Sequence, residues 1–145
     1  MTELPKTCVL DASVGIKLFV PEKYSEDVQR LMEESLLDSA NSLFVPDLFF
    51  IECANILWKK VQRGEYAADV AADQLVGLRA LELQSTPTAD LMERALEIAC
   101  LYGITAYDAC YVALSERNQS PLLTADARLA EILSDSPFNV ITLGD

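Results

Sequence analysis

Four acidic residues lie in segments of the sequence that are otherwise apolar. They are Asp11 in CVLDASV, Glu52 in LFFIECANIL, Asp108 in ITAYDACYVAL and Asp126 in PLLTADARLA. Aspartate and glutamate are rarely buried unless they form ion pairs or bind a metal ion. Four such residues spread over the whole chain therefore suggest one shared pocket that holds a cation.

The chemistry of such a pocket follows from the side chains available to line it. Carboxylates crowded together raise one another's pKa values, and a divalent cation removes that repulsion. The sequence has no histidine, and its four cysteines form no CxxC pair, so Mg²⁺ or Mn²⁺ is favoured over zinc. Such a site can activate water and stabilise charge on a phosphodiester during cleavage. Ser13, Asn55 and Thr124 are candidate supporting residues, as oxygen ligands or as groups that orient water.

Short apolar runs alternate with helical patterns and must position these residues. The runs predict strands at 7–11, 42–47, 121–124 and 138–143, with a further candidate strand at 81–86. Apolar spacing predicts helices at 13–20, 22–40, 47–62, 66–82, 88–102, 106–117 and 126–133. Ser13, Ser25 and Thr105 are the expected N-caps of three of them. This alternation predicts an α/β domain with a mainly parallel sheet.

The predicted elements allow the four acids to meet at one edge of the sheet. Asp11 ends one strand, and Asp126 lies just past the end of another. Glu52 lies about one turn into the helix after the second strand, and Asp108 lies in the first turn of a helix. Ligands of open parallel sheets bind in the crevice beyond the carboxyl ends of the strands. All four side chains are therefore expected to border that crevice.

Each acid taken alone also has a purely structural explanation. Asp11 and Asp126 could cap the helices that follow them. Asp108 lies three residues after Thr105, which is the spacing of a capping box, with aspartate in place of the usual glutamate. Glu52 could belong to a solvated stripe on its helix. The order and context of the four residues together carry the functional interpretation.

One basic cluster and two tyrosines also have alternative interpretations. Lys59, Lys60 and Arg63 could form a solvated helix end, which the helix dipole favours, or could contact phosphate groups. Tyr107 and Tyr111 could pack in or beside the core, or stack on bases. The apolar faces of the helices at 22–40 and 66–82 could serve the core or a dimer interface.

Composition limits the classes of protein that the chain can belong to. Its 145 residues, with a hydrophobic share of 51%, fit a single domain spanning residues 1–145. No apolar stretch is long enough to span a membrane and no secretory signal is evident, so a cytoplasmic location is expected, with the cysteines reduced in the core. The net charge of −12 counts against strong unaided binding to nucleic acid and suits metal ions or a basic protein partner.

Taken together, these segments resemble the PIN-domain nucleases and, among them, the VapC-type toxins. VLDASVGIKLFVPE looks like the opening motif of the family, with its strand-end aspartate, the following serine and the downstream Lys17. PDLFFIECANIL is similar to the second motif, LYGITAYDACYVALS to the third and PLLTADARLA to the fourth. The similarity extends in order over nearly the whole chain. Ser115 stands where the family more often has alanine.

The resemblance implies a three-layer α/β/α sandwich with a five-stranded, mainly parallel sheet, and Mg²⁺- or Mn²⁺-dependent cleavage of RNA. Asp11, Glu52, Asp108 and Asp126 would be the catalytic and metal-binding quartet, with Ser13, Asn55 and Thr124 in support. The candidate RNA contacts are Lys17, Lys59, Lys60 and Arg63. The resemblance also implies a homodimer and inhibition by a small cognate antitoxin, with no membrane partner.

Two other classes of protein are alternatives to this interpretation. A haloacid-type phosphatase needs a DxD motif at the first strand, but Ser13 occupies the third position, and the sequence lacks the strand-end lysine of a receiver domain. The remaining alternative is a PIN-like interaction or RNA-processing domain outside a toxin–antitoxin pair, with weak or no intrinsic cleavage. Metal-dependent cleavage of RNA by the pure protein distinguishes the two.

Overall fold

The protein folds around one parallel sheet of five strands. A computed structural model describes residues 4–38 and 40–143. The strands have the spatial order β3-β2-β1-β4-β5. All neighbouring strands run parallel, with Val9 of β1 opposite Phe44 of β2 on one side and Leu122 of β4 on the other. Their bounds are β1 (Cys8–Leu10), β2 (Leu43–Pro46), β3 (Gln84–Thr86), β4 (Leu122–Thr124) and β5 (Val140–Thr142).

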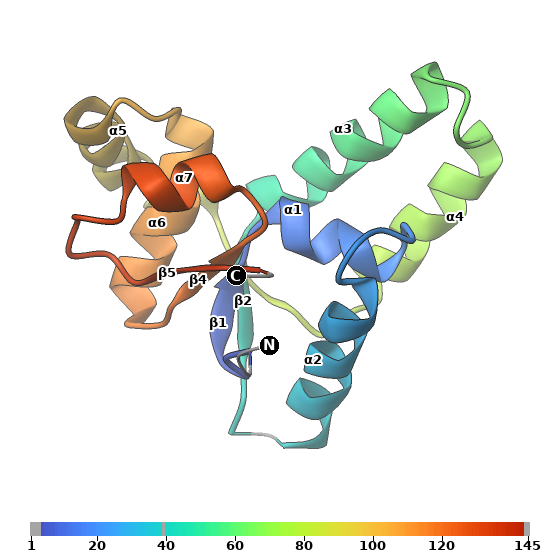
Figure 1. The fold of residues 1–145 in the computed structure, drawn as a ribbon, viewed down its shortest axis with the longest axis horizontal. Helices are drawn as coiled ribbons and strands as arrows, with labels where there is room; N and C mark the ends of the chain where they lie inside the picture. The colour runs from blue at the N-terminus through green and yellow to red at the C-terminus, as the bar shows by residue number, and fades with distance from the viewer. Residues whose placement is uncertain (1–3, 39, 144–145) are drawn as a thin grey trace.

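Helices cover both faces of this sheet, as Figure 1 shows. The α5–α6 pair lies on one side and α1 and α2 on the other, while α3 and α4 form an arm that extends away from the sheet. This arrangement confirms the predicted α/β fold. The helices are α1 (Ala12–Gly15), the 3-10 turn η1 (Ile16–Leu18), α2 (Ser25–Leu37), α3 (Leu48–Gln62), α4 (Ala68–Arg79), the 3-10 turn η2 (Thr88–Asp90), α5 (Met92–Tyr102), α6 (Ala106–Asn118) and α7 (Ala127–Ile132).

Local signals set several helix ends where the sequence predicts them. Gly103, at φ 68°, ends α5 in the left-handed region that favours glycine, and Thr105 caps α6 by accepting from the backbone N–H of Asp108. Ser25 differs from its expected role, because it is the first residue of α2 and Tyr24 is the N-cap. The Ser25 hydroxyl instead accepts from Glu22 N and donates to the carbonyl of Val20, which holds the loop before the helix.

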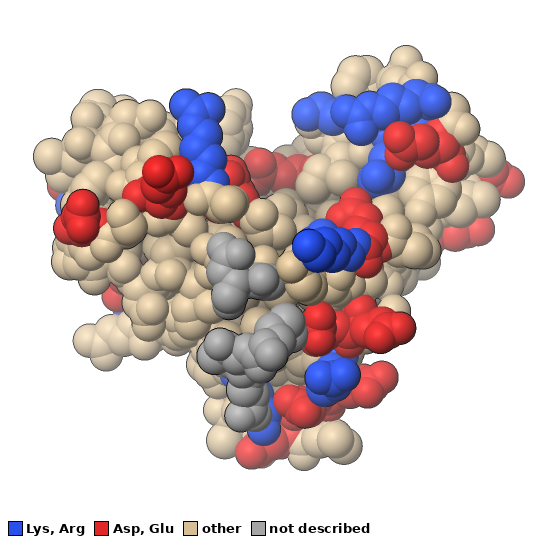
Figure 2. All heavy atoms as spheres, in the orientation of Figure 1, with Lys and Arg blue, Asp and Glu red and all other residues tan. Residues whose placement is uncertain are grey.

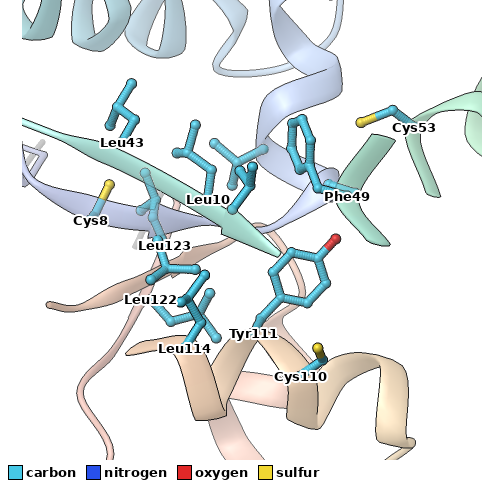
Figure 3. Packing of buried hydrophobic residues seen from close by; sticks show 14 of the residues in the cluster. Cys8, Leu10, Leu43, Phe49, Cys53, Cys110, Tyr111, Leu114, Leu122 and Leu123 are labelled. Atoms are coloured by element: carbon cyan, nitrogen blue, oxygen red, sulfur yellow. The ribbon is translucent and has the colours of Figure 1, made fainter. Parts of the chain in front are cut away.

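The core is continuous between the sheet and its flanking helices (Figure 3). Leu10, Leu122 and Leu123 from the central strands are fully buried, as is Phe49 from α3. Seven consecutive residues of α6, from Ala109 to Ser115, are buried, so this helix is enclosed on all sides rather than amphipathic. Cys8, Cys53 and Cys110 are buried as expected, whereas Cys100 is exposed on α5, contrary to the prediction of a core residue.

A glycine allows α1 to approach α3 closely. A Cβ atom on Gly15 would collide with the ring of Phe49, the buried aromatic residue of α3. Any larger side chain would push the two helices apart, at a cost of about 1–3 kcal/mol for overpacking a filled core. The contact matters because α1 begins directly after Asp11 and α3 carries Glu52.

Within the described residues, no single helix combines the length and the apolar character needed to cross a membrane. Only α5 and α6 taken together meet that requirement, and they are bent by 113° relative to each other.

Candidate functional site

The four acidic residues singled out in the sequence lie around the carboxyl edge of the sheet. Asp11 follows β1 directly, and Asp126 follows β4, the neighbour of β1. Glu52 lies in the second turn of α3, which begins just after β2, and Asp108 lies in the first turn of α6. The strand order β2-β1-β4 therefore brings segments from three parts of the chain to one crevice.

Asp11 is the most deeply placed of the four, with an exposed fraction of 8%. Its Oδ2 accepts hydrogen bonds from Ser13 Oγ at 2.8 Å and from Thr124 Oγ1 at 2.7 Å. These hydroxyls in turn accept from the backbone N–H groups of Ala125 and Asp126. Ser13 is therefore not the helix cap that the sequence predicts. It joins Thr124 in tying Asp11 to the turn after β4.

Glu52 is held by a tyrosine from another helix. The buried Tyr111 hydroxyl donates to Glu52 Oε1 at 2.6 Å across 59 residues of sequence. Figure 3 shows this hydroxyl directed toward α3. The sequence predicts Tyr111 in or beside the core or stacked on a base, and it does not reveal the role of the hydroxyl as a donor to Glu52. The only signal for this role in the sequence is that Tyr111 lies one turn after Asp108 on α6. This spacing predicts that the two side chains share one face of the helix.

Asp108 and Asp126 are both involved in helix starts, but in different ways. The cap of α6 is the Thr105 hydroxyl, which accepts from the backbone N–H of Asp108 at 3.1 Å. The Asp126 side chain is itself the cap of α7, because its Oδ1 accepts from Arg128 N at 3.0 Å and Leu129 N at 3.1 Å. Asp126 therefore does cap the helix that follows it, and its Oδ2 takes no part in the cap.

The acids affect one another electrostatically. Burial raises the pKa of Asp11, the hydroxyls of Thr124 and Ser13 oppose the shift, and Asp126 adds to it. Burial also raises the pKa of Glu52, against the Tyr111 hydrogen bond, with further increases from Asp11 and Asp108. The pKa of Asp108 is raised by burial and then by Asp11 and Asp126. The four carboxylates therefore form one interacting cluster, called the acidic cluster below.

The donor chemistry of this cluster fits a hard divalent cation. Its groups are carboxylate and hydroxyl oxygens, the ligands that Mg²⁺ and Mn²⁺ prefer. Burial raises the pKa of the adjacent Cys53 thiol to about 12, so it stays protonated and is a poor metal ligand. The side chains do not form a ready coordination sphere, because no group of three or more acidic, cysteine or histidine residues among those described lies close enough together to hold an ion.

The other residues considered from the sequence lie outside the acidic cluster. Asn55 is exposed on α3, beside Glu52 in a surface groove. Lys17, a candidate RNA contact, is buried, and its Nζ lies 2.9 Å from Glu22 Oε2. Lys60 is placed between Glu22 at 3.6 Å and Glu65 at 3.3 Å.

Two basic residues of α3 and its C-terminus remain directed outward. Lys59 and Arg63 are exposed, and within residues 4–38 and 40–143 neither forms an ion pair. Figure 2 shows Lys and Arg atoms along the upper edge of the α3 arm, with acidic atoms at the base of the space between this arm and the rest of the molecule. Cations that are not neutralised by neighbours are the ones available to contact a phosphate group.

The sequence is similar to known proteins over most of its length. The sequence model of the PIN domain family matches residues 8–133. The chain is 39% identical over 127 residues to Ribonuclease VapC3 of Pyrobaculum aerophilum, covering 85% of this chain and 92% of that protein. It is 38% identical over 95 residues to Ribonuclease VapC9 of Mycobacterium tuberculosis, covering 66% of this chain and 73% of that protein.

Solved structures share the fold at lower sequence identity. PAE2754 from Pyrobaculum aerophilum superposes with a TM-score of 0.68 at 21% identity, covering 97% of this chain and 87% of that chain. VapC20 from Mycobacterium tuberculosis, described as a sarcin-ricin loop cleaving toxin, gives 0.63 at 15% identity, covering 91% and 96%. A toxin–antitoxin complex from Klebsiella pneumoniae gives 0.61 at 14% identity, covering 94% and 97%. These likenesses concern the arrangement of helices and strands.

Proposed function

Because this chain belongs to the PIN domain family, we propose that it is an endoribonuclease that cleaves RNA phosphodiesters with the help of Mg²⁺ or Mn²⁺. Its relatives named ribonucleases support the choice of RNA as the substrate. The observation that carries the proposal is the acidic cluster. Three of its carboxylates have pKa values raised by burial and by one another, a cost that a divalent cation removes.

Asp11, Glu52, Asp108 and Asp126 are the residues that would hold the cation. When bound, it would supply Lewis-acid stabilisation of the phosphodiester and activate water for attack. Ser13 and Thr124 orient Asp11 by donating to its Oδ2. Tyr111 orients Glu52 through Oε1 in the same way, so Oε2 is the oxygen available for a ligand.

The same relatives support a proposal about the wider biological role. We propose that the protein is the toxin of a toxin–antitoxin pair, that it acts in the cytoplasm as a homodimer, and that a small antitoxin inhibits it. Solved structures of this fold include toxin–antitoxin complexes. The net charge of −12 suits a partner whose inhibitory segment is basic, since such a segment would be attracted to the acidic cluster.

Removal of divalent metal tests the nuclease proposal directly. The pure protein is expected to cleave single-stranded RNA in Mg²⁺ or Mn²⁺ and to lose essentially all of this activity in excess EDTA. Cleavage should return when Mn²⁺ is added in excess of the chelator, and Ca²⁺, which has the same charge but a larger radius, should support it poorly. Cleavage is measured on a gel with an end-labelled RNA.

Two outcomes of this assay would count against the proposal. Full cleavage in EDTA would exclude the metal mechanism. Binding of RNA or of a partner without cleavage in any divalent metal would favour the PIN-like interaction or RNA-processing role instead.

The Tyr111 hydroxyl provides a second prediction. Tyr111→Phe keeps the ring packing but removes the donor to Glu52 Oε1, so Glu52 is free to turn. We expect the affinity for Mn²⁺ to fall about ten- to hundredfold, as it does when a group that orients a metal ligand is lost. Calorimetric titration with Mn²⁺ measures this effect. Tyr102→Phe, which removes a hydroxyl on α5, should bind Mn²⁺ as the unmodified protein does. Equal affinity in both variants would show that Tyr111 does not position Glu52.

A further inference from the structure

A surface groove opens directly beside the acidic cluster. Its volume is about 600 Å³, and it lies along one face of α3 and the first turn of α6. The residues that line it are Leu48, Ile51, Glu52, Ala54, Asn55, Trp58 and Tyr107. Glu52 belongs both to the wall of this groove and to the acidic cluster, and Tyr107 immediately precedes Asp108. Whatever occupies the groove therefore lies next to the reacting centre.

Two aromatic residues line the groove from different helices. Trp58 of α3 has an exposed fraction of 55%, and Tyr107 of α6 has an exposed fraction of 63%. Ile51, Asn55 and Trp58 follow one another at spacings of four and three residues, so they share one face of α3. Exposed aromatic rings next to a polar site are the surfaces on which unpaired nucleobases stack.

The polar groups of this region also suit a nucleotide. The exposed Asn55 offers both a donor and an acceptor, which can pair with the edge of a base. Lys59 lies one turn farther along α3, and Arg63 is the C-cap one turn beyond it. In the described part of the chain these two cations have no acidic partner, although the protein as a whole carries a net charge of −12. A strand of RNA that leaves the groove along α3 would meet them with its phosphates.

We propose that this groove is the subsite in which an unpaired base of the RNA substrate stacks on Trp58 and Tyr107, so that the adjoining phosphodiester lies at Glu52. The inference rests on the proposed nuclease function and adds a preference for single-stranded RNA. The two exposed rings suit a base, and the cations Lys59 and Arg63 suit its phosphates. RNA is therefore the occupant that the chemistry of the groove favours.

Trp58 is the only tryptophan of the chain, so its fluorescence reports on the groove alone. The probe is an unstructured RNA of about twelve nucleotides, long enough to span a single-strand groove. It is added to the full-length Asp11→Asn variant in Mg²⁺, which binds without cleaving. We expect saturable quenching of Trp58, because stacked bases quench indole emission, and little quenching by a blunt RNA duplex.

Absence of quenching, together with normal cleavage by the unmodified protein, overturns the subsite and leaves the nuclease proposal standing. Quenching in a protein that never cleaves RNA supports the subsite and overturns the nuclease proposal.

Kinetics provide a second, independent measurement. Trp58→Ala is expected to raise KM for single-stranded RNA about tenfold with little change in kcat, and Trp58→Phe should restore most of the loss because it keeps a stacking face. Leu101→Ala is the matched control, since it removes a side chain of 71% exposure on α5. A similar effect of Leu101→Ala would overturn the proposal. So would a Trp58→Ala variant whose KM is unchanged but which a protein partner inhibits less well, because the groove would then bind protein.

Discussion

Replacing Asp11 by asparagine is expected to lower the rate of RNA cleavage by a factor on the order of 10³, because several kcal/mol of charge stabilisation depend on a complete set of ligands. The fold should persist. Both hydroxyl donors bind the same oxygen, Oδ2, so the asparagine carbonyl can take that place. Its amide group would then occupy the place of Oδ1 and carry no negative charge.

The same substitution should stabilise the metal-free protein. Asp11 is buried and lies close enough to the other acids for its charge to raise the pKa values of Glu52 and Asp108. A neutral residue of the same shape removes that repulsion, and we expect a gain of about 1–3 kcal/mol in the free energy of unfolding in EDTA. Urea denaturation measures this gain.

A control variant separates loss of the site from a general change in charge. Asp73→Asn removes one negative charge from the exposed surface of α4 and should leave cleavage unchanged. If Asp11→Asn retains cleavage within about tenfold of the unmodified protein, Asp11 does not hold the metal ion. If both variants lose activity equally, the effect comes from net charge.

Without divalent metal, the stability of the protein is expected to fall as the pH rises. Folding raises the pKa values of Asp11, Glu52 and Asp108, so these groups bind protons more tightly in the folded chain. Their contribution to stability is complete below the unfolded-state pKa values and is lost as the pH rises through the folded-state values. The loss begins above 3.8 for the two aspartates and above 4.5 for Glu52.

Divalent metal should reverse this trend. Deprotonated carboxylates are the form that binds Mn²⁺, so stabilisation by the ion grows with pH. At a hundredfold excess over Kd, Tm should rise by about 5–10 °C near neutral pH and very little near pH 4. Tm is measured against pH in EDTA and in Mn²⁺. The Asp11→Asn variant should show a shallower decline in EDTA, and an identical slope in both proteins would contradict the assignment to this cluster.

Much of the fold could be predicted because its signals are local. The short apolar strands, the Thr105 cap and the glycine after α5 each act within a few residues, and all are present. The same kind of local rule predicts Ser13 as a cap, because serine is a favoured N-cap residue. The hydroxyl bonds to Asp11 instead, together with Thr124, which is 111 positions farther along the chain than Ser13. Rules for helix capping concern only neighbouring residues, so they do not predict a contact with Thr124.

The positions of the acids could be predicted, but their supporting contacts could not. Strand ends and helix starts placed Asp11, Glu52, Asp108 and Asp126 at one edge of the sheet. The Tyr111 hydroxyl reaches Glu52 only through the packing of α6 against the sheet, which a helical pattern does not specify. Lys17 is similar, because its burial beside Glu22 depends on how the loop before α2 folds back.

The hydrogen bonds that orient the acids join distant parts of the chain, and this has a consequence for protein synthesis. Asp11 meets Thr124 across 113 residues, and Glu52 meets Tyr111 across 59. A nascent chain that has emerged only as far as β3 contains two of the four acids, and Ser13 is the only one of the three hydroxyl donors made by then. Contacts of such long range form late. A chain that has not yet been extended to Asp126 therefore cannot assemble the acidic cluster.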